Sequence, residues 1–410
     1  PEAKTTQVVE LKDGDTFNLT ASFVKKKIQG SQVKMLAYNG SIPGPIIKIP
    51  QGAEITVNFK NNTDVDSTLH SHGVRVENAF DGVPNVTQQA VKPGGSFTYK
   101  LKFPDAGAFW YHPHVREDYA QELGLYGNFI VIPEEKDYWV EVDREETLFL
   151  DDIAFINGKV AQVDKEKVDH TLMGRFGNVM LTNGDDNYKL NAKQGERVRF
   201  YLTNAANTRI FNISIPNARM KLVGADNGKY EREEWIDSVM IAPSERQIIE
   251  VWFDKAGEYQ ILHKTPDKTY TMGTIAIEQH PVTTSYLMVP RENKDVISAL
   301  DPLRPLFNKP ADKSLTLTMT MGGGHDMHMM GDGTQMNNDE MGMENDGEKI
   351  EWEDTMNMMN VMSTTETLKW KLIDDVTKKE NMDIGWQFKK GDKIKVKIFI
   401  GYKIDGRAPG

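Results

Sequence analysis

The sequence contains no cysteine among its 410 residues. This absence excludes disulfide bridges and every metal site that depends on a thiolate ligand. The sequence also lacks any apolar run that approaches the roughly 20 residues a membrane-spanning helix needs. A formal net charge of -11 has the wrong sign for binding nucleic acid or an anionic membrane surface, so we expect neither as a partner.

The rest of the composition is ordinary for a soluble globular protein, with 39% hydrophobic and 27% charged residues. A chain of 410 residues is long enough for two or three domains with cores of their own. It opens with Pro1-Glu2-Ala3-Lys4 rather than with a signal peptide. If the protein is exported, we expect its signal to have been removed already.

Two histidine pairs of identical spacing stand out against this background. One residue separates His70 from His72, and one residue separates His112 from His114. Side chains two positions apart on an extended strand project to the same side, about 7 Å apart along the strand. Each pair can therefore direct two imidazoles at one place.

Alternating apolar residues precede both pairs, at 55–59 and 97–103, and predict that the pairs lie at strand ends in one sheet domain. Imidazole is a common ligand of copper, zinc, iron and nickel, and four imidazoles without a carboxylate pair favour copper or zinc. A single pair is more often surface decoration or packing. Two pairs that hold four of the nine histidines favour a shared metal site instead.

Five motifs include or surround these histidines: NGSIPGP at 39–45, TLHSHG at 68–73, DGVP at 81–84, FWYHPH at 109–114 and GLYG at 124–127. In motifs, order and intervals together, the segment resembles the first cupredoxin domain of the multicopper oxidases. The resemblance implies an all-β fold of tandem cupredoxin domains, which are Greek-key β-sandwiches, with two domains complete and a third incomplete.

The resemblance also implies an activity, the one-electron oxidation of Cu(I) or phenolic substrates coupled to the reduction of O2 to water. It implies copper as cofactor, with His70 at the type 2 position and His72, His112 and His114 at type 3 positions. Asp81 matches a position that assists proton delivery in relatives, although a turn-forming aspartate is an equally good interpretation. A secreted or periplasmic location is implied as well.

We expect residues 1–135 to form the first cupredoxin domain. Short strands between turn signals predict a second sandwich at 136–291, which resembles the middle domain of the family and carries no copper ligands. Its histidines, His170, His263 and His280, form no pair and are interpreted as structural. Residues 292–313 are rich in Pro, Asp and Lys and are interpreted as a linker.

The expected third domain, at 314–410, is partial and carries a methionine-rich acidic insertion at 319–362. The insertion holds 12 of the 20 methionines and ten Asp or Glu against one Lys, a formal charge of -9. Such a segment cannot bury its thioethers without burying carboxylates, which leaves a flexible loop or a site for Cu(I). Thioether sulfur prefers Cu(I), and the candidate recruitment residues are His325, Met327, His328, Met329 and Met330.

The resemblance ends after Phe399. The family's later His-x-x-His-x-His and His-Cys-His motifs do not occur, so the chain offers half of the trinuclear ligands and no blue-copper cysteine. We expect a truncated chain, a longer native protein or a variant that binds copper without turnover. A C-terminal segment or a partner chain would complete the third domain, because early strands alone leave an open core.

Two further functions compete with the oxidase. The first is a noncatalytic copper-binding or scaffold protein built from cupredoxin domains, although such proteins usually lose the histidines. The second is a zinc hydrolase, which is disfavoured because no mixed set of histidine and carboxylate ligands with an open position is evident.

Overall fold

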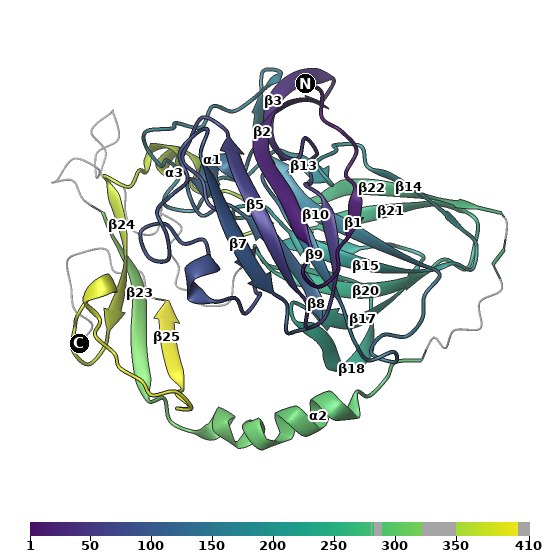
Figure 1. The fold of residues 1–410 in the computed structure, drawn as a ribbon. Helices are drawn as coiled ribbons and strands as arrows, with labels where there is room; N and C mark the ends of the chain where they lie inside the picture. The colour runs from purple at the N-terminus through teal and green to yellow at the C-terminus, as the bar shows by residue number, and fades with distance from the viewer. Residues whose placement is uncertain (280, 283–288, 322–349, 401–410) are drawn as a thin grey trace. The chain divides into compact units, whose positions relative to one another are not determined.

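The computed structural model describes residues 1–279, 281–282, 289–321 and 350–400 (Figure 1). Two compact units make up the chain. The first comprises Pro1–Lys165 and Arg175–Ile297, and the second comprises Glu166–Gly174 and Ser298–Gly410. Strands dominate the described residues, which confirms the all-β prediction. Among these residues no helix has the length and apolar character required to cross a membrane.

A β-sandwich made of two sheets forms the first part of the first unit. One sheet has the order β3-β2-β5-β7, with β2 at Thr16–Ile28, β3 at Ser31–Tyr38, β5 at Glu54–Asn62 and β7 at Ser96–Lys102. The other has the order β1-β4-β9-β8-β6, with β1 at Val8–Glu10, β4 at Ile46–Pro50, β6 at His70–His72, β8 at Gly107–His112 and β9 at Gly127–Ile132. The 3-10 helix η1 (Asn78–Phe80) and helix α1 (Glu117–Ala120) lie in the connections.

Alternation explains why the predicted strands form. In β5, Ile55, Val57 and Phe59 are buried, and in β7 Tyr99 and Leu101 are buried. The apolar side chains of each strand therefore face one core, as the period of two requires. Both strands belong to the sheet opposite the one that carries the histidines, so the alternating segments do not lead directly into the pairs.

Every residue of β8 is buried, which alternation alone does not explain. One face of the strand packs in the core of the first sandwich. Its other face meets the second sandwich, where Ala108 packs in a cluster with Tyr201, Val223 and Ile248. A strand covered on both faces is held firmly, and His112 is its last residue.

The second sandwich follows in the same unit. Its six-stranded sheet has the order β13-β10-β15-β20-β17-β18, with β10 at Arg144–Ile153, β13 at Val179–Thr182, β15 at Arg197–Asn204, β17 at Arg219–Ala225, β18 at Gly228–Ile236 and β20 at Arg246–Trp252. The five-stranded sheet has the order β14-β22-β21-β16-β19, with β14 at Lys189–Lys193, β16 at Phe211–Ser214, β19 at Val239–Ile241, β21 at Gly257–Lys264 and β22 at Thr269–Glu278. A small ribbon joins β11 (Phe155–Ile156) to β12 (Lys159–Val160).

The second unit contains a three-stranded sheet of order β24-β23-β25, with β23 at Lys313–Met321, β24 at Leu368–Asp374 and β25 at Val396–Ile400. Helix α2 (Lys294–Leu300) and the 3-10 helix η2 (Asp301–Asn308) occupy much of the expected linker. Helix α3 (Asn357–Met362) and the 3-10 helix η4 (Asn381–Asp383) complete the described elements. The domain boundaries at 135, 291 and 313 stay predictions.

The last strand starts later than its alternating sequence predicts. The alternating residues at 392–399 predict a strand from Asp392, but β25 begins at Val396. Its pairing with β23 begins where that strand begins, since Lys313 pairs with Val396, and the carbonyl of Lys395 before it accepts the backbone N–H groups of Asp312 and Lys313. Asp312 instead accepts the backbone N–H of Lys395 at 2.8 Å, which closes a loop there.

Candidate metal centre

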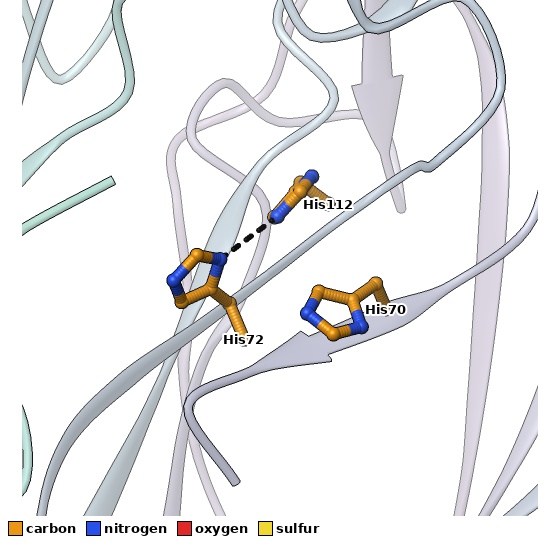
Figure 2. A group of neighbouring side chains, drawn as sticks. All are labelled: His70, His72 and His112. Atoms are coloured by element: carbon orange, nitrogen blue, oxygen red, sulfur yellow. Dashed lines mark hydrogen bonds between the residues drawn. The ribbon is translucent and has the colours of Figure 1, made fainter. Parts of the chain in front are cut away.

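The two histidine pairs meet because their strands are neighbours. Strand β6 pairs antiparallel with β8, and the register sets His70 opposite His112 and His72 opposite Trp110. The ring centroids of His70 and His72 lie 5.5 Å apart, and those of His70 and His112 lie 5.3 Å apart. Figure 2 shows the three imidazoles of His70, His72 and His112 turned toward a common region.

Nitrogen atoms of these three histidines are close enough to share an ion. One ring nitrogen from each of His70, His72 and His112 lies within 4.8 Å of the other two. The ring of His114 is 4.4 Å from that of His70 and 5.2 Å from that of His112, centroid to centroid. The structure thus brings together all four histidines of the two pairs, while their role as ligands stays a prediction.

Hydrogen bonds at Nδ1 orient three of the four rings. The Nδ1–H of His70 donates to the carbonyl oxygen of Asp81 at 2.7 Å, and that of His112 donates to the carbonyl oxygen of Pro113 at 2.8 Å. Nδ1 of His114 contacts the carboxylate of Glu117. With the proton held on Nδ1, Nε2 carries the lone pair that a metal needs.

His72 presents its other nitrogen. Its Nδ1 lies 3.3 Å from Nε2 of His112, and its ring also packs against Trp110 at a centroid distance of 5.3 Å. Trp110 in turn stacks on His112 at 4.1 Å. Because the Nδ1–H of His112 is donated to Pro113, Nε2 of His112 accepts the bond between the two histidines and Nδ1–H of His72 donates it. The other tautomer of His72, with its proton on Nε2, would offer Nδ1 as a ligand beside Nε2 of His112.

Burial keeps the imidazoles in the form that binds metal. Desolvation lowers the pKa of His70, lowers that of His72 to about 3, and lowers that of His112 well below its ordinary value. Neighbouring histidines lower these pKa values further, because two imidazolium ions would repel each other. At neutral pH the three rings are uncharged, with lone pairs that no proton blocks.

Asp81 reaches the cluster by a tight turn. The following residue, Gly82, has φ of +78°, and a Cβ there would lie 2.1 Å from the carbonyl oxygen of Leu69. Only glycine allows this approach, which places the carbonyl of Asp81 over His70. Its carboxylate Oδ1 is 3.4 Å from Nδ1 of His70, and the side chain is about one-third exposed, at 34%. The predicted proton-delivery role of Asp81 is compatible with this place and stays a prediction.

This donor set fits copper. Copper binds well to imidazole nitrogens, and the site gathers three of them, from His70, His72 and His112, with hydrogen-bonded outer groups that fix the orientation of His70 and His112. Zinc shares the preference for imidazole, so the side chains by themselves do not separate the two metals.

Two side chains beside the cluster, those of Glu117 and Arg246, were not predicted from the sequence. Glu117, three residues after His114, could have been noticed as an acidic residue at the start of a short helix. Arg246 comes from the second sandwich, and a Cβ on Gly73 would lie 2.6 Å from its Nη2 atom. No local pattern connects Arg246 with the histidines, because the packing of the two sandwiches brings it there.

The other predicted residues lie elsewhere. His263 is fully buried in the second sandwich, where its ring stacks on Tyr270 and its Nδ1 accepts the N–H of Asn212 at 3.0 Å. His170 belongs to the second unit, where it pairs with Asp169 at 2.8 Å. His280 lies outside the described residues, and so do the candidate Cu(I)-recruitment residues His325, Met327, His328, Met329 and Met330.

Family models match both sandwiches. Residues 21–136 match one model described as multicopper oxidase, and residues 134–291 match a second with the same description. The two matches together cover the whole of the first unit except its ends, including all four histidines.

Curated relatives point the same way. The chain is 30% identical over 240 residues to multicopper oxidase mco of Staphylococcus haemolyticus, which covers 57% of this chain and 52% of that protein. It is 27% identical over 385 residues to copper resistance protein A of Escherichia coli, covering 82% of this chain and 58% of that protein. The chain therefore spans about half the length of the curated relatives it matches.

Solved structures share the fold. Lac15 from a marine microbial metagenome is 28% identical with a TM-score of 0.59, over 74% of this chain and 75% of that one. A multi-copper oxidase from Pseudomonas thermotolerans is 24% identical with a TM-score of 0.60, over 77% and 73%, and supports the fold alone. These similarities confirm the predicted class, an all-β chain with cupredoxin-type domains.

Proposed function

We propose that this chain, which belongs to the multicopper oxidase family, takes part in the oxidation of Cu(I) or phenolic substrates. In this reaction O2 would be the electron acceptor and water the product. The observation that carries the proposal is the convergence of uncharged imidazoles from two neighbouring strands. Support for the wider activity comes from the family. The choice between Cu(I) and phenolic substrates is left to experiment.

In this proposal His70 holds copper at the type 2 position, and His72, His112 and His114 hold copper at type 3 positions. Copper bound there would supply the one-electron redox chemistry that the reduction of O2 requires. The chain contributes half of a trinuclear ligand set. Because residues 1–410 contain no cysteine, the thiolate of a blue-copper site does not come from them.

The protein's own groups would orient the ligands and move protons. The carbonyls of Asp81 and Pro113 and the carboxylate of Glu117 hold three rings in place through Nδ1. We propose Asp81 as the proton carrier, because its carboxylate is close to His70 and also reaches solvent. Reduction of O2 to water consumes four protons, so a carboxylate between solvent and the cluster has a defined task.

Further parts of the proposal rest on sequence alone. His325, Met327, His328, Met329 and Met330 would recruit Cu(I), since soft thioethers prefer that ion and nearby carboxylates attract cations. The partners would be O2 and small reducing molecules, together with a C-terminal segment or partner chain that completes a third cupredoxin domain. We place the protein outside the cytoplasm, either secreted or periplasmic, with no nucleic-acid or membrane partner.

Copper titration of the double variant His72→Ala, His114→Ala tests the metal site. We expect the copper bound with nitrogen ligands to fall sharply, because two of the four rings are lost and only His70 and His112, 5.3 Å apart, remain. Binding is measured by equilibrium dialysis, and the nitrogen ligands are identified by electron paramagnetic resonance of Cu(II).

The matched control is His170→Asn. It removes a histidine outside the cluster, and asparagine tolerates the positive φ of 55° at that position. We expect this control to bind copper as the unaltered chain does. Undiminished copper binding in the double variant would remove His72 and His114 as ligands and point to the methionine-rich segment as the place where the metal is held.

A further inference from the structure

A positive charge from the second sandwich is buried against the histidine cluster. Arg246 is the first residue of β20 and is only 3% exposed. Its Nη2 atom occupies the space where Gly73 would carry a side chain, at 2.6 Å from the ideal Cβ position. Gly73 directly follows His72 in the chain and has φ of +82°. The guanidinium therefore lies one residue away from a proposed copper ligand.

Hydrogen bonds fix this guanidinium in place. Its Nε donates to the carbonyl oxygen of Ala108 at 2.9 Å, on the strand that ends in His112. Its Nη1 donates to the carbonyl oxygen of Ser244 at 2.8 Å and lies 3.0 Å from Oδ1 of Asp226. The side chain is thus anchored to both sandwiches and cannot turn away from the cluster.

The charge is only partly compensated. Asp226 pairs with Arg246, and its side chain is 46% exposed, so water screens its field. Glu245 is a second carboxylate that acts on this guanidinium from a greater distance. Arginine keeps its proton at any working pH. The charge lies close to His72, because Nη2 of Arg246 is 2.6 Å from the ideal Cβ position of the next residue, Gly73.

We propose that Arg246 is a positioning residue that acts electrostatically on the metal centre, weakening the binding of divalent copper more than that of monovalent copper. The inference rests on the proposed function, since it takes the histidine cluster to be the copper site. Coulomb repulsion is proportional to the charge of the ion, so Cu(II) is penalised twice as much as Cu(I). The second sandwich, from which we expect no copper ligand, would in this way favour the reduced state of copper bound at the first sandwich.

The variant Arg246→Gln tests the proposal, because we expect it to strengthen copper binding rather than to weaken it. Glutamine removes the charge and keeps a side chain that can donate hydrogen bonds. We expect the histidine-dependent affinity for Cu(II) to rise about tenfold, and that for Cu(I) to rise about threefold, the square root of that factor. Affinities are measured by competition with chelators specific for each oxidation state, as the component that is lost in His72→Ala, His114→Ala.

Two further variants separate charge from structure. Arg246→Lys keeps the charge but loses the forked hydrogen bonds, and we expect both affinities to stay near those of the unaltered chain. Asp226→Asn removes the compensating charge, and its amide oxygen can still accept the backbone N–H of Arg246, which Asp226 accepts at 2.9 Å. We expect this variant to bind Cu(II) a few-fold more weakly, opposite in direction to Arg246→Gln.

The outcomes distinguish the two proposals. Weaker binding of both ions in Arg246→Gln and Arg246→Lys alike would show a structural role and overturn the inference, while the proposed copper site would stand. Equal affinity in Arg246→Gln and the unaltered chain would overturn it too. Absence of histidine-dependent copper in the unaltered chain would overturn the proposed function itself, together with the inference that depends on it.

Discussion

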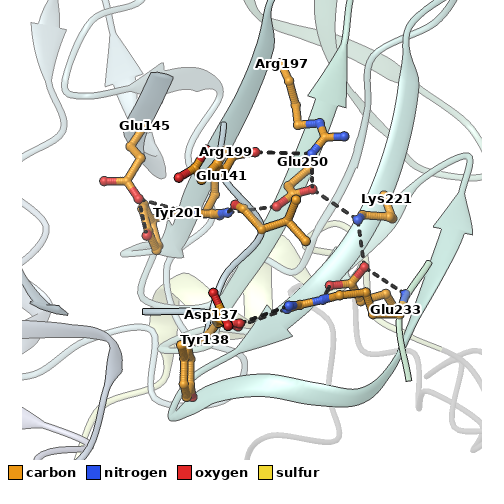
Figure 3. A network of polar contacts seen from close by, with 12 residues as sticks. Asp137, Tyr138, Glu141, Glu145, Arg197, Arg199, Tyr201, Lys221, Glu233 and Glu250 are labelled. Carbon is orange, nitrogen blue, oxygen red and sulfur yellow. Dashed lines mark hydrogen bonds and ion pairs between the residues drawn. The ribbon is translucent and has the colours of Figure 1, made fainter. Parts of the chain in front are cut away.

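The two sandwiches of the first unit each bury a cluster of polar side chains, and the clusters are satisfied in different ways. In the second sandwich Lys221 lies between two carboxylates, 2.7 Å from Glu233 and 3.1 Å from Glu250 (Figure 3). Glu250 also accepts from Arg199 at 2.9 Å. Cations and carboxylates alternate through this network, so every charge in it has an opposite neighbour.

The cluster of the first sandwich has no such internal compensation. Burial keeps His70, His72 and His112 uncharged, and their ring nitrogens bond to backbone carbonyls or to one another rather than to charged side chains. Arg246, which comes from the other sandwich and lies beside Gly73, is positively charged. Buried charges that are paired with their opposites compensate one another, whereas ring nitrogens gathered within 4.8 Å of one another are close enough to share a cation.

Removing one member of the charge network should have the largest effect on folding. In Glu250→Gln, Lys221 and Arg199 lose a buried counter-charge, and we expect the free energy of unfolding to fall by about 3–5 kcal/mol. Urea denaturation measures the change. The control is Glu292→Gln, which alters an exposed ion pair with Arg232 and should leave stability unchanged. Equal stability of the two variants would contradict the structural role assigned to the network.

A smaller effect is expected at the orienting carboxylate of the metal centre. Glu117→Gln replaces the charged partner of His114 with a neutral one, and we expect copper affinity to fall about 10- to 100-fold. Isothermal titration measures it. Asp118→Asn is the matched control, because the neighbouring Asp118 pairs with Arg116 at 2.8 Å instead. If both variants lost affinity equally, the effect would belong to helix α1 rather than to the contact with His114.

The pH dependence of the free energy of unfolding should also distinguish the histidine cluster from the charge network, and this effect is expected to be smaller still. The pKa of His72 is about 3 in the folded chain and about 6.5 when unfolded, so between these values only the unfolded chain binds the proton. Stability therefore falls as pH falls below about 6.5. We expect His72→Ala to reduce the pH dependence of the free energy of unfolding between pH 6.5 and 5, by the equivalent of up to about one bound proton. Urea denaturation at each pH measures this change.

Glu122 provides the control of opposite sign. Burial raises its pKa to about 8, so the folded chain keeps a proton that the unfolded chain releases at an ordinary carboxyl pKa. Its contribution is present at low pH and is lost as pH rises through about 8. In Glu122→Gln, we expect the free energy of unfolding to fall less as pH rises through about 8. Identical slopes in His72→Ala and the unaltered chain would contradict the neutral, buried state of the imidazole.

Local patterns predicted much of the fold and of the site. Period-two alternation placed β5 and β7, and the one-residue spacing of the histidines predicted that each pair gathers in one place. These features depend on residues close together in the chain. That His70 faces His112 follows from strand pairing, which the motifs implied only through the family resemblance.

Contacts between distant segments could not be predicted in this way. The burial of both faces of β8 and the place of Arg246 beside Gly73 depend on how the second sandwich packs on the first. The late start of β25 depends on where its partner strand begins. Predicting any of these requires the register and packing of segments far apart in sequence, which alternation and spacing do not contain.

Diffraction from crystals of the copper-loaded chain, recorded at the copper absorption edge, tests the central claim most directly. We predict anomalous density among the ring nitrogens of His70, His72, His112 and His114, with Nδ1 of His72 as a ligand beside Nε2 of His112. Copper density confined to other parts of the chain, with these four rings free of metal, would contradict it.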